Sequence, residues 1–106
     1  MSDATVTKTK IKVPPGLGPD GRRFYRAIAE QFSVDHAGEK ELLFTAASAL
    51  DRLKQAQRAI AKDGVVIPGR GGVLVRHPAT TIEREARAGF LAALKLMDLQ
   101  IDEGGF

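Results

Sequence analysis

The chain has 106 residues, a length typical of one domain. Hydrophobic residues make up 43% and charged residues 27% of it, which excludes a disordered chain. It contains no cysteine, so disulfides and thiolate metal sites are excluded. The 16 basic and 13 acidic residues give a formal net charge of +3, which permits a basic patch without requiring one. No apolar run approaches the roughly 18 residues that would span a membrane, and no apolar segment follows the first lysines, so we expect neither a membrane segment nor a signal peptide.

Residues 1–16 are predicted to form a flexible basic arm, because lysines alternate there with small and polar residues. The lysines of this arm are Lys8, Lys10 and Lys12. A cluster of prolines and glycines then marks the start of a single helical domain over residues 17–100. Residues 101–106 are expected to be a loose tail.

Two helices are predicted in the first two thirds of the chain. The first is expected over Pro19–Phe32, where apolar residues recur every four positions, and Asp20 suits the positive end of its dipole. The second is expected over His36–Asp63, where apolar residues follow the four-three spacing of a heptad. The members of this row are Leu42, Ala46, Ala49, Leu53, Ala56 and Ile60. Its small residues predict close antiparallel packing against another helix.

A β-hairpin is predicted over residues 65–75, because two short β-branched runs flank the glycine-rich connector Pro68–Gly72. A lone hairpin is marginal in water, so we expect it to pack on a helix or on a neighbouring subunit's strand. The third helix is expected over Ala79–Gln100, with Thr80 or Thr81 as its cap. Its buried row is predicted to be Ile82, Ala86, Gly89, Ala93 and Leu96, with Phe90, Leu94 and Met97 beside it. The predicted fold class is therefore mainly α, with three helices and one hairpin between the second and third.

The residues offer little for catalysis or metal binding. His36 and His77 are the only histidines, and acidic pairs two residues apart point away from each other on a helix. The connector Pro68–Gly72 lacks the spacing and the Lys-Ser/Thr end of a P-loop, so we interpret it as a turn that uses glycines for positive φ. His77 is interpreted as a structural residue at a strand-to-helix corner. We expect no enzymatic activity, no cofactor and no metal site.

Clustered cations are the remaining candidates for a site, because lysine and arginine bind nucleic-acid phosphates by releasing counterions. Each cluster also suits an ordinary solvated surface, and Arg70 at the hairpin tip suits either role equally well. The candidates for DNA binding, in order, are Arg22, Arg23 and Arg26; Lys54, Arg58 and Lys62; Arg70 and Arg76; and Lys8, Lys10 and Lys12.

Several motifs follow one another in a distinctive order. Gly21-Arg22-Arg23-Phe24-Tyr25 opens the first helix, and alanine and charged residues fill the second over Ala46–Lys62. A glycine-tipped hairpin and the step His77-Pro78 precede Ile82–Leu91, which reads Ile-x-Arg-Glu-Ala-x-x-x-Phe-Leu. In this order, the chain from Leu17 to Leu99 resembles the small subunit of tailed-bacteriophage terminases.

The resemblance implies a ring-shaped homo-oligomer without an active site, encoded by a virus or prophage and working in the host cytoplasm. It implies recognition of viral double-stranded DNA at the packaging start site, and delivery of that DNA to the large terminase subunit, which carries the ATPase and nuclease. Two alternatives stay open: a ring-forming phage structural or head–tail adaptor protein that binds no DNA, and a dimeric transcriptional regulator. For the regulator, the first two helices and the turn between them would form a helix-turn-helix.

Overall fold

The computed structural model describes residues 11–98, which form three helices and one antiparallel hairpin. The predicted fold class, mainly α with a hairpin between the second and third helices, is confirmed. No helix in the described range combines the length and the apolar character needed to cross a membrane. The elements in chain order are α2 (Pro19–Gln31), α3 (Ala37–Asp63), β1 (Val66–Pro68), the 3-10 turn η1 (Arg70–Gly72), β2 (Leu74–Arg76) and α4 (Ala79–Leu96).

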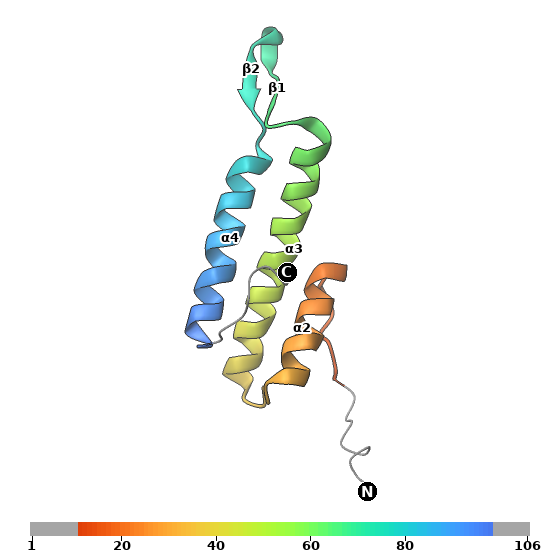
Figure 1. Ribbon diagram of the computed structural model, residues 1–106, viewed down its shortest axis with the longest axis vertical. Helices are drawn as coiled ribbons and strands as arrows, with labels where there is room; N and C mark the ends of the chain where they lie inside the picture. The colour runs from red at the N-terminus through yellow and green to blue at the C-terminus, as the bar shows by residue number, and fades with distance from the viewer. Residues whose placement is uncertain (1–10, 99–106) are drawn as a thin grey trace, which may run out of the picture.

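The long helix α3 is the centre of the molecule, with α2 and α4 packed along it in the opposite direction (Figure 1). Its 27 residues correspond to about 40 Å of helix. The hairpin continues the long axis beyond the end of α3, so the molecule is elongated, with extents of 67 × 24 × 23 Å. Gly64 ends α3 with φ of 89°, a positive value that glycine adopts without strain.

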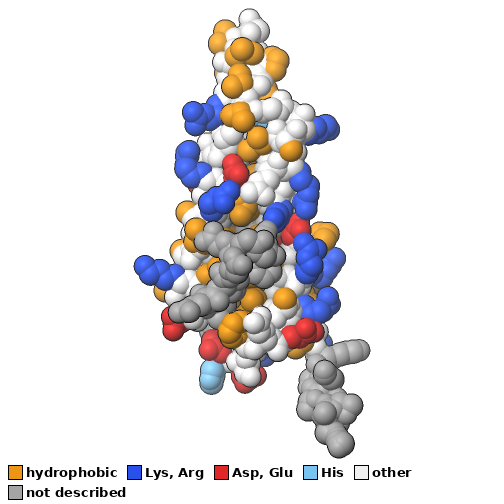
Figure 2. Space-filling view, viewed as in Figure 1, with side chains coloured by type: hydrophobic (Ala, Val, Ile, Leu, Met, Phe, Trp, Pro, Cys, Tyr) orange, Lys and Arg blue, Asp and Glu red, His pale blue; other side chains and the backbone are white. Residues whose placement is uncertain are grey.

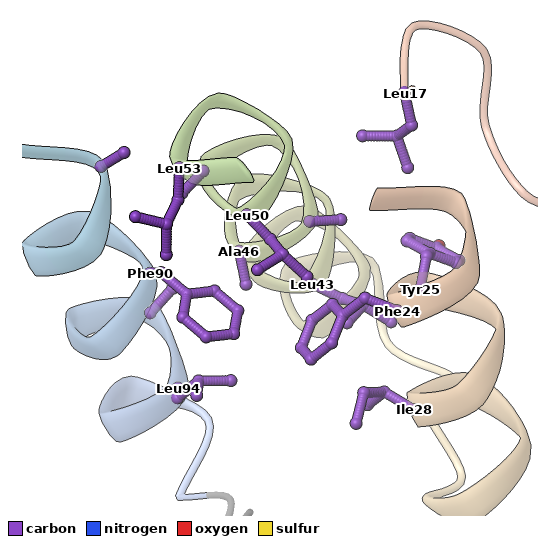
Figure 3. Close-up of a cluster of buried hydrophobic side chains, with 14 residues drawn as sticks. Leu17, Phe24, Tyr25, Ile28, Leu43, Ala46, Leu50, Leu53, Phe90 and Leu94 are labelled. Carbon is purple, nitrogen blue, oxygen red and sulfur yellow. The ribbon is translucent and has the colours of Figure 1, made fainter. Parts of the chain in front are cut away.

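The core forms where α2 and α4 both meet α3 (Figure 3). Phe24 of α2 and Phe90 of α4 pack edge to face, with ring centroids 5.3 Å apart and planes at 67°. Leu43 and Leu50 of α3 project between α2 and α4 beside these rings and are buried. The predicted row of α3 is confirmed: its four central members are buried and its two end members are half-buried.

The predicted buried row of α4 is only partly right. Ala86 and Ala93 are buried as predicted, but Ile82, Gly89 and Leu96 face outward. The helix instead turns the adjacent row inward, including Phe90 and Leu94. Phe90 packs on Phe24 of α2 and Leu94 joins the same core cluster, and burial of these two large side chains sets the rotation of the helix.

The ends of α4 also differ from the prediction. Neither predicted threonine is the N-cap: the helix begins at Ala79, and the Thr80 hydroxyl donates to the His77 carbonyl oxygen at 2.8 Å. The helix ends at Leu96 rather than Gln100, because Asp98 has a left-handed φ of 57°. Residues 99–106, including the predicted tail over 101–106, lie outside the described residues.

Most of the predicted arm, including Lys8 and Lys10, also lies outside the described residues. Within the described part, Lys12 is exposed, whereas Ile11 and Val13 on either side of it are partly buried against the core. Contact with the core therefore begins before the predicted domain start at residue 17.

The hairpin forms where it was predicted. Val66 pairs with Arg76, Ile67 with Val75 and Pro68 with Leu74. The Gly69 amide donates to the Val73 carbonyl oxygen at 2.6 Å and closes the turn. The helices leave its side chains largely exposed, and hydrophobic side chains gather at this end of the molecule (Figure 2).

Candidate nucleic-acid interface

A buried carboxylate of α3 fixes the position of α2. Gly18, the N-cap residue of α2, has no side chain to accept the free amides of the first turn. Asp51 supplies both acceptors instead: its Oδ2 accepts from the Gly18 amide and its Oδ1 from the Gly21 amide, each at 2.7 Å. The side chain of α3 therefore caps α2, and the two helices cannot slide along each other without breaking both bonds.

Gly21 makes this close approach possible. A Cβ at this position would lie 2.7 Å from the Ala47 carbonyl oxygen and closer still to the carboxylate of Asp51. Both atoms belong to the facing helix, and neither can move without breaking a hydrogen bond or the helix. The glycine that opens the Gly-Arg-Arg-aromatic motif is thus required by the contact between α2 and α3.

A second carboxylate joins the cations of the two helices. Asp20 lies in the first turn of α2 with its side chain 9% exposed. Its Oδ1 accepts from Arg23 at 2.8 Å, and its Oδ2 accepts from Arg58 of α3 at 2.5 Å. The hydrogen bond from Arg58 lowers the pKa of Asp20, burial opposes this, and the bond from Arg23 adds to the lowering. Asp20 is therefore ionised at neutral pH and holds both guanidinium groups.

Asp20 consequently joins one member of each of the first two predicted cation clusters, Arg23 of α2 and Arg58 of α3. Both arginines bound to Asp20 remain more than 60% exposed, so they can still meet a ligand. Lys54 and Lys62 lie one turn before and after Arg58 on α3, and positions four apart share a helix face. We call the resulting set the α2–α3 cation surface: Arg22, Arg23, Arg26, Lys54, Arg58 and Lys62. Lysine and arginine side chains are visible along both flanks of the helical part (Figure 2).

The other candidates lie elsewhere. Arg70 is at the tip of the hairpin and Arg76 near its base, both exposed and both beyond the end of α3. Lys12 is exposed ahead of α2. The structure therefore links the first two clusters through Arg23, Asp20 and Arg58, and places the hairpin pair apart from them.

His77 has the structural role that was predicted for it. Its Nδ1 accepts from the Ala79 amide at 3.0 Å and so caps the first turn of α4. Because Nδ1 accepts, the neutral ring carries its proton on Nε2, which donates to Oδ2 of Asp63 at 3.0 Å. The ring thereby ties the end of α3 to the start of α4 at the base of the hairpin.

Asp51 is the important residue that the sequence analysis did not single out. The sequence does hold a signal for its role. The start of α2 reads Gly18-Pro19-Asp20-Gly21, with no capping side chain at Gly18, so its free amides require an acceptor from another element.

Residues 11–98 contain no group of three or more His, Asp or Glu side chains that could hold a metal ion. Burial, with a smaller contribution from the charge of Glu41, raises the pKa of Tyr25, so its phenol is neutral at neutral pH. The chemistry that the site offers is charge attraction to an extended anion.

Comparison of the chain with protein-family models, curated proteins and solved structures finds no match.

Proposed function

We propose that this chain is the small subunit of a tailed-phage terminase: a non-catalytic, ring-forming protein that binds viral double-stranded DNA at the packaging start site. It delivers that DNA to the large subunit in the host cytoplasm. Two lines support the proposal. One is the motif order and its resemblance to this family. The other is the α2–α3 cation surface, which suits a phosphate backbone.

The observation that carries the proposal is the pairing of Arg23 and Arg58 with Asp20. It holds one arginine from each of two helices at the same carboxylate while leaving the guanidinium groups exposed. Contacts of this kind go to phosphates, so they position DNA and make its binding salt-dependent, but carry little sequence information.

Assembly into a ring would compensate for the small net positive charge of a single chain. A formal charge of +3 is small for a DNA-binding protein. In a ring, however, the same surface is repeated in every subunit, so contacts that are weak singly act together on one duplex. Exposed apolar side chains on the hairpin give such an assembly a surface to bury.

A paired-variant experiment tests DNA binding. Arg26→Gln with Lys62→Gln removes two charges from the α2–α3 cation surface without touching the Asp20 pairs. The matched control, Lys40→Gln with Lys95→Gln, removes two exposed charges from other parts of α3 and α4. Affinity for a DNA duplex is measured by mobility shift over a range of salt concentrations. We expect the slope of log affinity against log salt to fall by about one unit for each phosphate that the variant no longer neutralises.

The control should keep the wild-type slope. Equal slopes for both double variants would reject the α2–α3 cation surface as the DNA site. A ring that fails to shift DNA at low salt would favour the structural or adaptor alternative. A protein that forms only dimers while binding DNA would favour the regulator, although α2 lies along α3 rather than across it (Figure 1).

A further inference from the structure

The hairpin exposes apolar side chains on both of its faces. Residues opposite each other in an antiparallel pair share a face, and successive residues alternate. We call the face bearing Val66, Pro68, Leu74 and Arg76 face A. Face B bears Ile67 and Val75, together with Val65 and Val73, which the flanking hydrogen bonds keep in register. Leu74 on face A is 67% exposed and Val73 on face B is 65% exposed.

This pattern is unusual for a two-stranded sheet. A hairpin at the surface normally has one apolar face on the core and one polar face in water, whereas strands apolar on both sides are typical of sheets covered on both sides. Within residues 11–98 no element covers either face. Two short strands are also marginal in water by themselves, so burial of these faces would stabilise the hairpin.

We propose that, in the ring inferred above, face A of each hairpin packs on face B of the next copy's hairpin. The inference rests on the proposed function for the ring itself and adds the surface that closes it. Each contact joins face A of one copy to face B of the next. Because every copy has both faces, every hairpin in the ring is covered on both sides. Such head-to-tail contacts generate rings, whereas a two-fold dimer would bury one face and leave the other in water.

Charge at the base of the hairpin fits this arrangement. Arg76 is the charged residue of face A. On the side of face B, His77 stands opposite Val65 and its ring bonds to Asp63, whose side chain is 46% exposed. Stacking A on B therefore brings an arginine of one copy toward a carboxylate of the next. Stacking A on A would instead bring two arginines together.

The faces rather than the edges form the contact. Each strand has three residues, and Pro68 has no amide hydrogen to donate along its edge. Edge pairing would add few hydrogen bonds and would leave the valines and Leu74 exposed. Face packing removes their apolar area from water.

Two variants of the full chain test this. Face A is changed by Val66→Thr with Leu74→Thr, and face B by Val73→Thr with Val75→Thr. Threonine retains strand preference and adds a hydroxyl. The control is Ile82→Gln with Leu91→Gln, which makes exposed apolar positions of α4 polar with a good helix former. Mass is measured by light scattering after gel filtration, and helix content by far-UV circular dichroism.

We expect the wild type and the control to form one large species, and each face variant to elute as a monomer with unchanged helix content. An equimolar mixture of the two face variants should form a pair and go no further. Each variant keeps one intact face, so only one productive contact exists between them. Face variants that keep the wild-type mass would overturn the inference, and so would a face B variant that still forms dimers by itself.

DNA binding separates this inference from the function on which it rests. A wild type that assembles through its hairpins but does not shift DNA would reject the function and keep the inference. If the wild type shifts DNA and both face variants still form rings of the wild-type mass, the function is kept and the hairpin contact is rejected. A wild type that is monomeric at every concentration tested would overturn both the ring and the hairpin contact.

Discussion

Two regions along α3 differ in what they bury. At the middle of α3, which meets the start of α2, polar groups are buried and satisfied: Asp51 accepts two amides, and Asp20 binds two arginines. At the C-terminal end of α3, where the hairpin follows, apolar side chains are exposed and uncovered within the described residues. The first region is complete within one chain, so it should determine stability. The hairpin end is incomplete, so it should determine assembly.

The largest expected effect on stability is at Asp51. Asp51→Ala leaves the Gly18 and Gly21 amides without their acceptor, and should lower the free energy of unfolding by about 3 kcal/mol. Asp51→Asn keeps one acceptor oxygen and should cost about half as much. Urea unfolding followed by circular dichroism at one fixed protein concentration measures both. Wild-type stability in Asp51→Ala would show that the capping bonds contribute nothing.

A glycine-to-alanine pair tests the close approach of α2 to α3. Gly21→Ala places a methyl group against Asp51 and the Ala47 carbonyl, and should cost about 2 kcal/mol. Gly89→Ala is the control, because its added methyl meets open space on α4. It should stabilise the helix by up to about 1 kcal/mol. Glycine-to-alanine substitution should therefore lower the stability of the protein at Gly21 and raise it at Gly89, and thermal unfolding of both variants measures the difference.

Asp20→Asn should change stability and DNA binding in opposite directions. Removing the pairs with Arg23 and Arg58 should cost about 1 kcal/mol at neutral pH. The same change removes a negative charge from the α2–α3 cation surface, so DNA affinity should rise. Unfolding and mobility-shift measurements on one preparation test both. A stability loss without any gain in DNA affinity would place the DNA contact elsewhere.

The stability difference should also depend on pH. The pKa of Asp20 is lowered in the folded protein, so its ionised form stabilises the fold above the ordinary value of 3.8. As the pH falls from that value through the lowered pKa of the folded state, the carboxylate becomes protonated and this contribution is lost. Wild type and Asp20→Asn should therefore converge in stability at acid pH. A gap that persists there would mean that packing, not charge, separates them.

The sequence predicted the elements well because their signals are local. The repeat of α3 and the valines around a glycine turn depend on neighbours along the chain, and both are confirmed. The predicted row of α4 through Ile82, Gly89 and Leu96 is wrong in part, because two apolar rows competed. The row that contains Phe90 faces the core because Phe90 packs on Phe24 of α2, a contact that lies far away in the sequence. The start of α2 shows that an acceptor is needed, but Asp51 lies 30 residues after Gly21, so no local pattern identifies it as that acceptor.

The smallest expected effect compares the middle of α3 with its C-terminal end most directly. Asp63 accepts from His77 as Asp51 accepts from Gly21, and both belong to the same helix. Asp63 is 46% exposed, so water can replace the missing partner, and Asp63→Asn should cost about 0.5 kcal/mol or less in a single chain. If face B meets Arg76 of the next copy, however, the same variant should shift the assembly equilibrium toward smaller species in dilution experiments. A variant that matches the wild type in both unfolding and assembly would remove Asp63 from the proposed contact, while the apolar faces would still be tested by their own variants.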